Sequence, residues 1–386
     1  MKQDDTLLRM LARRKFEDVE LLAYAEWLGF NSELELENLE GAKLRKQVAK
    51  EILANPQQVL SRLPLEDLQL LQILKDAEPG MGMKAYPTSH TMAMAEIGLA
   101  EQEDIEDGEM EMITIAEDFK QAIRPHVDAV LENFDVKFRI YIEQIIIGAL
   151  NLYGTLTESE LKAILKECMD LTDDGSGVLE HIRPQSILLH LISVDGSYDD
   201  GEDYYVSPFE QNLGEYILAE REKQSETTTL KTYDVDEIRE AGNMPIPTIP
   251  NPVNDILLNT LETKLGFTEQ EAYYWEFMLW RLAQDDDASP VGILQLLIDA
   301  SPSSKKLKDI NDIEPIVQVV MDYLNHSPRW IFYGHCPNDL GSSDQMIESD
   351  DFDAFIPYVT ASTAEPNAPC PCGSGKKFKD CCGRGS

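Results

Sequence analysis

Four of the chain's six cysteines lie close together in the stretch APCPCGSGKKFKDCCG, at residues 368–383. They are Cys370, Cys372, Cys381 and Cys382. Four thiolates are a typical tetrahedral ligand set for zinc, with Zn–S distances of about 2.3 Å. Gly373 and Gly375 allow the backbone to turn tightly around a metal. The sequence therefore predicts a Zn²⁺ site with these four cysteines as its ligands.

Other kinds of site fit this stretch less well. A disulfide between the neighbours Cys381 and Cys382 would be strained, and disulfides are rare where thiols stay reduced. A phosphate-binding loop needs glycine at the position of Cys370, and serine or threonine at the position of Lys377. A segment this short buries too little surface to fold alone, so metal binding would supply the folding free energy, about 10–16 kcal/mol by analogy with zinc-finger peptides.

The run CPCGSGKKFKDCCG at residues 370–383 resembles the SEC-C motif, a family named for the tail of the SecA translocase motor. The family pattern is Cys-x-Cys-Gly-Ser-Gly, a lysine-rich aromatic stretch, and then Cys followed by Cys or His. Each of these positions is matched here, with Cys382 at the variable last place. The resemblance covers about the last twenty residues. It implies a tail that contacts a protein partner, such as the ribosome, a chaperone or nascent-chain machinery.

The chain is strongly acidic, with 71 Asp and Glu against 33 Lys and Arg and a formal net charge of −38. Such a charge disfavours binding to nucleic acid and to anionic membranes, since both require Lys and Arg. The most apolar run, 136–153, carries Lys137, Arg139 and Glu143, which indicates a buried helix rather than a membrane span. The first sixteen residues do not resemble a signal peptide. We expect a cytoplasmic protein with reduced thiols.

Hydrophobic periodicity predicts a mainly α fold of helical domains, winged-helix segments and a small C-terminal zinc knuckle. We divide the chain into a helical N-terminal region at 1–80, an acidic hairpin-containing segment at 81–135, a winged-helix-like domain at 136–242, a Pro-rich linker at 243–254, a helical domain at 255–330, an acidic tether at 331–367 and the SEC-C zinc motif at 368–386.

The segment from Val136 to Phe209 has the element order of a winged helix. A long helix should end at Tyr153–Gly154, and a second should begin at the capping box formed by Thr157 and Glu160. A third is expected from about Pro184 to Leu191, followed by a strand, an acidic turn and a strand. This order of elements predicts one winged-helix segment.

A looser copy of the same pattern runs from Leu65 to Phe119. Asp107–Gly108 is a hairpin signal, so we expect a β-hairpin with an acidic tip there. Both segments contain Asp-Gly-Glu, then a short strand, and then Phe119 or Phe209. This similarity is the basis for a hypothesis of two winged-helix segments in the chain.

The winged-helix segment lacks the charges that DNA recognition requires. Its third helix, HIRPQSILLHLI at residues 181–192, has Arg183 as its only Lys or Arg, and its wing, SYDDGED at 197–203, is acidic. Contacts to phosphates need Lys or Arg on both elements. The segment is therefore expected to be a protein–protein scaffold.

No catalytic motif is evident in the sequence. The histidines form neither HExxH nor another metal-binding pair; they are His90, His126, His181, His190, His326 and His335. Neither a Gly-x-Ser-x-Gly elbow nor a dinucleotide fingerprint is present. The acidic cluster at 101–111 lacks EF-hand spacing and is typical of a solvated turn. We predict that the protein is not an enzyme; the remaining alternative is an unrecognised site in Asp255–Trp330.

Two functional hypotheses follow from these patterns. The first is a cytosolic, zinc-binding adaptor or regulatory protein whose tail contacts a protein partner. The second is a transcription- or stress-related regulator that uses the winged helix to touch nucleic acid or polymerase, which a basic patch assembled from separate segments would favour. The sequence shows no such patch.

The double substitution Cys370→Ser, Cys372→Ser should release zinc and leave the melting temperature of the rest of the protein nearly unchanged, because the tail is expected to be tethered rather than docked. Metal analysis and scanning calorimetry of the purified variants measure both quantities. A large loss of thermal stability in the double variant would show that the tail packs against the body.

Overall fold

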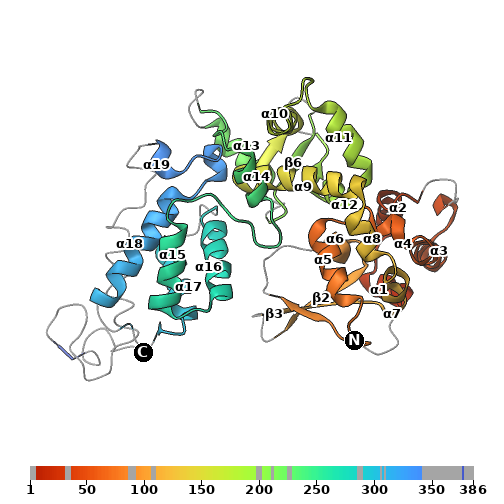
Figure 1. Cartoon of the computed structure of the whole chain (residues 1–386), viewed down its shortest axis with the longest axis horizontal. Helices are drawn as coiled ribbons and strands as arrows, with labels where there is room; N and C mark the ends of the chain where they lie inside the picture. Colours follow the sequence, from red (N-terminus) through yellow and green to blue (C-terminus); the bar gives the residue numbers. More distant parts are fainter. Residues whose placement is uncertain are drawn as a thin grey trace. The chain divides into compact units, whose positions relative to one another are not determined.

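The structure is a computed structural model. It describes residues 6–30, 36–85, 93–105, 110–196, 202–209, 213–223, 228–284, 290–304, 307, 310–340 and 376–377. Within these ranges the chain is mainly helical, as predicted, with two small antiparallel sheets (Figure 1). None of the described helices is long and apolar enough to cross a bilayer. Contacts divide the chain into two units: unit 1 is Met1–Glu215 with Asp234–Pro245, and unit 2 is Tyr216–Tyr233 with Ile246–Ser386.

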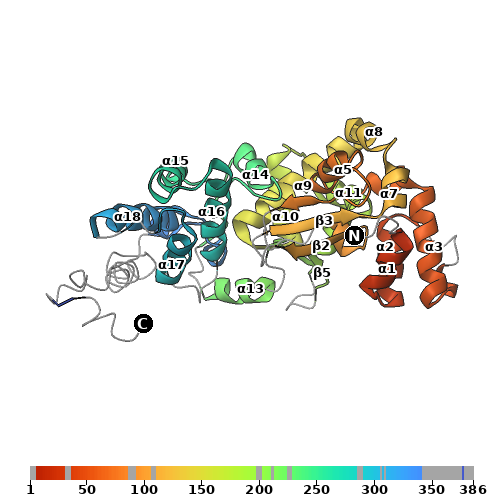
Figure 2. The same cartoon turned by 90° about the horizontal axis from the view of Figure 1, so that it is seen from below.

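Unit 1 begins with a group of short helices: α1 (Leu7–Arg14), α2 (Asp18–Trp27), α3 (Gly41–Ala54) and α4 (Pro56–Leu60). Both α1 and α2 pack on α3, and Figure 2 shows the three side by side. Their facing side chains, including Leu11, Leu44 and Val48, are almost completely buried. The carboxylate of Asp18 accepts a hydrogen bond from the backbone N–H of Gly41 at 2.9 Å. Apolar stripes at helical spacing therefore form the core here, as the sequence predicts.

The next segment of unit 1 contains the first sheet. The helices and strands of this segment are α5 (Leu65–Leu74), β1 (Met83–Ala85), α6 (Ala93–Glu96), β2 (Ala100–Ile105), β3 (Met110–Ile115), α7 (Glu117–Ile123) and α8 (Val127–Glu132). The strand order is β1-β3-β2. The predicted hairpin is confirmed, since Ala100 pairs with Ile115 and Ile105 with Met110; the acidic tip at 106–109 lies outside the described residues. Ile115 is buried, while Glu103 is exposed to solvent.

The following segment of unit 1 contains the second sheet, whose strands pair in the same order. The helices and strands of this segment are α9 (Phe134–Tyr153), β4 (Thr155–Thr157), α10 (Glu158–Cys168), α11 (Ser176–Ile182), α12 (Ile187–Ile192), β5 (Ser193–Val194) and β6 (Tyr204–Val206). The strand order is β4-β6-β5. In both sheets the first strand pairs with the last, and the last pairs with the middle one.

Local signals placed most boundaries of this second segment correctly. Helix α9 ends at Tyr153, and Gly154 has a φ of 74°, which favours glycine. Both hydrogen bonds of the Thr157–Glu160 capping box are present. The third helix begins later than predicted, at Ile187, because residues 183–185 form a 3₁₀ turn and the Ser186 side chain caps the helix by accepting from the N–H of Leu189 at 3.1 Å.

Helix α14 (Val235–Ala241) returns to unit 1 and packs directly on α9. A Cβ on Gly148 would lie 1.7 Å from the carbonyl oxygen of Ile238, and one on Gly242 would lie 1.9 Å from that of Gln144. No larger residue fits at either glycine without moving the backbone. The Asn151 side chain also donates to the Ala241 carbonyl at 2.7 Å. Backbone contact therefore fixes the distance between α9 and α14.

Unit 2 is a helical assembly. Its main helices are α15 (Asn254–Thr260), α16 (Glu269–Leu282), α17 (Pro290–Ala300) and α18 (Ile310–His326), and the boundary with unit 1 lies inside α13 (Gly214–Glu222). The predicted capping box of Thr268 and Glu271 is present at the start of α16. Trp280 and Trp330 are fully buried and meet edge to face, with ring centroids 5.9 Å apart. These two aromatic rings form the centre of the core of unit 2.

Residues 331–340, which the sequence analysis places at the start of the tether, are packed into unit 2. They include part of a 3₁₀ turn at Trp330–Phe332 and helix α19 (Pro337–Leu340). Tyr233 donates its hydroxyl to the Gly334 carbonyl at 2.6 Å, and Arg221 Nε donates to the Trp330 carbonyl at 3.0 Å. Contacts with buried aromatic side chains keep residues 331–340 packed in unit 2, although the sequence after residue 340 is acidic and polar. Residues 341–367 lie outside the described residues.

The buried carboxyl of Glu276 on α16 should make unit 2 less stable at alkaline pH. Burial raises the pKa of Glu276 to about 7 from its usual 4.5. The folded state therefore holds this proton more tightly than the unfolded state, so its contribution to stability is complete below about pH 4.5 and is lost as the pH rises through about 7. Above that pH, Glu276→Gln should unfold with a free energy up to about 3 kcal/mol higher than the wild type.

Thermal unfolding of the two proteins from mildly acidic to mildly alkaline pH measures the difference. The matched control is Glu314→Gln, which removes an exposed carboxyl from α18 in the same unit. It should leave the pH dependence unchanged. Parallel curves for the wild type and Glu276→Gln would contradict the prediction.

Candidate functional site

The four predicted zinc ligands, Cys370, Cys372, Cys381 and Cys382, lie outside the described residues. Between them, Lys376 and Lys377 are described, and both are exposed. The chemistry of the donor set fits zinc, because four thiolates satisfy a tetrahedral metal without help from other residues. The predicted zinc knuckle therefore has a suitable ligand set.

The described residues hold no other candidate metal centre. Within them, no group of three or more His, Cys, Asp or Glu is placed to bind a metal ion. Cys168 and Cys336 are free cysteines. Burial, and secondarily the nearby charge of Glu167, raises the pKa of the Cys168 thiol to about 11. Burial also raises the pKa of Cys336. Neither thiol is a thiolate at neutral pH, so neither resembles a reactive or metal-binding cysteine.

The acidic hairpin uses its described carboxylates in surface pairing. Glu101 on β2 accepts from Arg13 Nε at 2.7 Å, and Glu111 on β3 accepts from the Gln102 amide at 2.6 Å. These carboxylates lie on the paired strands β2 and β3 rather than in a turn. The carboxylates are spread along two strands, and they do not converge on a common point in the described residues.

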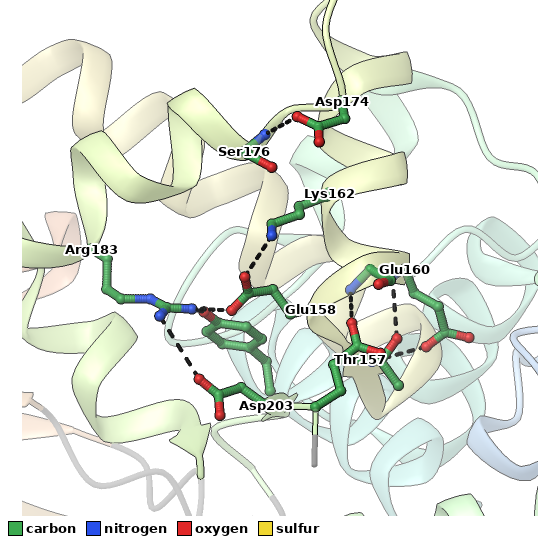
Figure 3. Close-up of polar contacts among 11 residues, drawn as sticks. Thr157, Glu158, Glu160, Lys162, Asp174, Ser176, Arg183 and Asp203 are labelled. Carbon is green, nitrogen blue, oxygen red and sulfur yellow. Dashed lines mark hydrogen bonds and ion pairs between the residues drawn. The ribbon is translucent and has the colours of Figure 1, made fainter. Parts of the chain in front are cut away.

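Arg183, the single Lys or Arg of the predicted third helix, lies in the 3₁₀ turn before α12 and is engaged in an internal network (Figure 3). Its guanidinium donates to the Glu158 carboxylate and to the Tyr205 hydroxyl, and it lies over the Tyr205 ring at 5.7 Å. Asp203, from the acidic wing, lies 3.8 Å from the same guanidinium. Two carboxylates and a phenol surround this cation. A phosphate would have to displace them, so Arg183 is poorly placed to read nucleic acid.

Glu158 is the centre of this network. It accepts from Lys162 one helical turn further along α10 at 2.6 Å, as well as from Arg183 (Figure 3). Partial burial alone would raise the pKa of Glu158, but the hydrogen bonds and positive charges of Lys162 and Arg183 outweigh it, and the pKa is lowered. The network therefore contributes stability at neutral pH and loses it as acid protonates Glu158.

The loop before α11 also uses its acidic residues structurally. Asp174 accepts from the backbone N–H of Ser176 at 3.0 Å (Figure 3). Asp173 accepts from that of Gly175 at 3.0 Å. A carboxylate at such a position satisfies N–H groups that the first turn of a helix leaves unpaired. These aspartates position α11 and are not arranged as metal ligands.

His190 on α12 is part of the core packing. Its ring stacks on Trp27 with centroids 5.1 Å apart and an interplanar angle of 2°. Burial first, and then the charges of Arg183 and Arg62, lower the pKa of His190. The imidazole is therefore neutral at physiological pH and adds no positive charge to the third helix. His335 contacts the Thr229 carbonyl at 3.1 Å, which is a structural contact.

The comparison with protein-family models decides the nature of the tail. Residues 367–384 match the SEC-C motif. The tail is a SEC-C motif. The match confirms the resemblance inferred from the cysteine spacing, and it covers only the SEC-C tail. No curated protein and no solved structure matches the chain.

Sequence reasoning missed one group of polar residues in the interior of unit 1. Arg139 and Glu143 form a completely buried ion pair on α9, and Glu66 and Asp67 are buried at the start of α5. The available signal was a charged residue inside an apolar run, IYIEQIIIGAL at residues 140–150. The charge of Glu143 argues against a membrane span, and in such an apolar run it also indicates a buried partner.

Removal of Arg183 should weaken the second sheet segment through Glu158. Arg183→Met and Glu158→Gln should each lower the unfolding free energy, and the double variant should lose less than the sum, with a coupling of about 1 kcal/mol for this partly exposed pair. Denaturant unfolding at neutral pH measures this cycle. The coupling should fade as the pH falls below the usual pKa of a glutamate side chain, because acid then protonates Glu158.

The matched control is Lys162→Met, which removes the other cation bound to Glu158. Its coupling with Glu158→Gln should be only about 0.3–0.5 kcal/mol, the usual range for an ion pair one turn apart on a helix. Strictly additive effects of Arg183→Met and Glu158→Gln would mean that Arg183 is held by something else.

Proposed function

We propose that this protein is a cytoplasmic, zinc-binding adaptor or regulatory protein without enzymatic activity, whose SEC-C tail contacts a protein partner. The match of residues 367–384 to the SEC-C motif carries the proposal. The SecA tail that gives the family its name is a protein-contact module, so a ribosomal, chaperone or nascent-chain component is the expected partner by resemblance. The acidic composition of the chain supports a protein rather than a nucleic-acid partner.

Cys370, Cys372, Cys381 and Cys382 would hold Zn²⁺, and the metal would supply the folding free energy of the tail. Four thiolates and one Zn²⁺ together carry a formal charge of −2. The exposed Lys376 and Lys377 lie between the two cysteine pairs in sequence, so they would partly neutralise this charge. The completed knuckle would place these lysines next to a metal, and we assign partner contact to it.

Residues 330–375 contain no Lys or Arg. This stretch ends just after the first cysteine pair. Its first part packs into unit 2, which leaves about thirty residues before the motif as a tether. A tether of that length keeps the tail at a high effective concentration near the body while allowing it to search for a partner. The negative charge of the tether would also discourage it from binding the acidic body.

Both three-stranded segments of unit 1 are best interpreted as winged helices used as protein scaffolds. The support is their element order and their shared strand order, in which the third strand lies between the first and the second. The pairing of Arg183 with Glu158 argues against phosphate contacts by the third helix. A binding surface for protein is therefore favoured over a DNA-reading surface.

The same element order supports the second candidate function, a transcription- or stress-related regulator that touches nucleic acid or polymerase. The two candidates differ in their response to salt. Binding through phosphate contacts weakens steeply as salt rises, whereas binding of a protein to the zinc knuckle does not require released counterions. Fluorescence anisotropy with a duplex DNA probe at low salt should show no binding if the adaptor proposal is correct.

Affinity capture from cytosol tests the adaptor proposal. The intact protein is compared with Cys370→Ser, Cys372→Ser, and zinc is measured on both. Partners and zinc should be lost together. Cys382→His is the matched control, since the family pattern accepts histidine at this place; it should keep both zinc and partners. Cys168→Ser controls for loss of a cysteine outside the motif. The same partner list in all variants would refute the role of the tail.

A further inference from the structure

Helix α3 carries a stripe of lysines on its solvent face. Lys43, Lys46 and Lys50 are exposed. They are three and four positions apart, so they follow one another along a single face of the helix. The buried face of the same helix packs into the core of unit 1 through Leu44 and Val48. Helix α3 lies on the outside of the group that it forms with α1 and α2 (Figure 2). A partner can therefore reach the stripe from solvent.

The three lysines of the stripe form no ion pair with the residues that the structure describes. Elsewhere in unit 1, exposed cations do have carboxylate partners, as in the pairs Arg124–Asp76 and Lys137–Glu132. The chain contains 71 acidic residues, so carboxylates are abundant. Three neighbouring lysines that no carboxylate of this part of the chain neutralises are available to an acidic group from outside.

Acidic side chains near α3 are used in other contacts. Glu51, which follows Lys50 in the sequence, accepts from the side-chain amide of Gln47 at 2.7 Å. The carboxylate of Asp18 accepts from the backbone N–H of Gly41 at the start of the helix. The lysines also repel one another, since like charges three or four positions apart on a helix are destabilising. An anion bound along the stripe would relieve this repulsion.

We propose that the lysine stripe of α3 binds a short acidic segment of a partner protein. Each ammonium group donates hydrogen bonds and each carboxylate accepts them, so every lysine can hold one Asp or Glu of the segment. This contact surface lies on the body of the protein, and it is separate from the one assigned to the SEC-C tail. Binding at the stripe does not depend on zinc.

The spacing of the lysines sets the length of the acidic segment. A helix rises 1.5 Å per residue, so the stripe from Lys43 to Lys50 is about 10 Å long. An extended chain advances about 3.3 Å per residue, so about four to six residues rich in Asp and Glu cover it. The exposed carboxyls of Glu37 and Glu40 precede the helix and limit the stripe at that end.

Nucleic acid fits the stripe less well than an acidic peptide does. Its affinity grows with the number of phosphates that Lys and Arg neutralise, and three lysines on a chain with a net charge of −38 supply few such contacts. The stripe also lies on a single helix, whereas the nucleic-acid alternative requires a patch assembled from separate segments. A short peptide with a few carboxylates matches the three lysines in number and length.

Fluorescence anisotropy of hexaglutamate that carries a neutral fluorophore, titrated with the full-length protein in physiological salt, tests the proposal. We expect a dissociation constant on the order of 1 mM, because each exposed ion pair contributes little. Hexaglutamine with the same fluorophore should bind at least about tenfold more weakly, since it lacks the carboxylates. The triple variant Lys43→Gln, Lys46→Gln, Lys50→Gln should weaken hexaglutamate binding by about tenfold or more. The corresponding triple substitution by Arg should retain binding, because it keeps the positive charges.

The matched control is Lys376→Gln, Lys377→Gln, which removes two exposed lysines of the tail. It should leave hexaglutamate binding unchanged. Cys370→Ser, Cys372→Ser should also bind hexaglutamate as the wild type does, so a failure of the proposed tail function and a failure of this proposal are distinguishable. The substituted side chains on α3 face solvent, and the glutamine triple variant should unfold at no lower temperature than the wild type.

Three results would overturn the proposal. The first is that hexaglutamate does not bind the wild type, or that hexaglutamine binds as tightly. The second is that the tail variant loses binding while the glutamine triple variant of α3 keeps it. The third is that a DNA duplex binds more tightly than hexaglutamate and is released by the α3 substitutions, which would assign the stripe to nucleic acid.

Discussion

The buried ion pair between Arg139 and Glu143 is the interaction on which unit 1 depends. Both side chains are almost completely excluded from solvent. Arg139 also donates to the Leu63 carbonyl at 2.6 Å, immediately before α5, and Glu143 accepts from Ser186, the residue that caps α12. One pair therefore connects the first sheet segment, the central helix α9 and the third helix of the second segment. Loss of one partner would leave a buried charge, at a cost of about 3–5 kcal/mol.

The ion pair uses only one of the two oxygens of Glu143. The oxygen that faces Arg139 and Ser186 is used for structure, and the other, Oε2, is buried and accepts no hydrogen bond from the described residues. Further along α9, the glycine contact with α14 excludes side chains altogether, and the packing there is backbone against backbone. The same helix thus carries the buried ion pair and, from the neighbouring Gln144 onward, a close backbone contact with α14.

Sequence reasoning predicted the elements whose signals are local. The capping boxes at Thr157 and Thr268, the end of α9 at Gly154 and the acidic hairpin are all present, since each depends on residues within a few positions of one another. The four cysteines of the SEC-C tail were recognisable for the same reason, because all the expected ligands lie in one short segment.

Features that depend on distant residues were not predicted. The pairing of Arg183 with Glu158 joins residues 25 positions apart, and the bond from Tyr233 to Gly334 joins residues 101 positions apart. Neither contact leaves a periodic pattern in the sequence. For the same reason residues 331–340 were assigned to a tether, whereas the contacts of Trp330 and Gly334 place them in unit 2.

The body and the tail have opposite chemistry. Arg183, just before α12, is paired with carboxylates, and the lowered pKa of His190 on α12 keeps its imidazole neutral. The SEC-C tail concentrates thiolates and lysines within a few residues. In our account the body is an acidic scaffold, and recognition is assigned to a tail that folds around its own metal.

X-ray absorption at the zinc edge, on the full-length protein loaded with one equivalent of zinc, tests this account most directly. We predict four sulfur ligands at about 2.3 Å and no nitrogen or oxygen ligand. Cys382→His should replace one sulfur by one nitrogen at about 2.0–2.1 Å. A wild-type spectrum dominated by oxygen or nitrogen ligands would show that the zinc is bound elsewhere on this acidic chain, and it would contradict the assignment of Cys370, Cys372, Cys381 and Cys382 as its ligands.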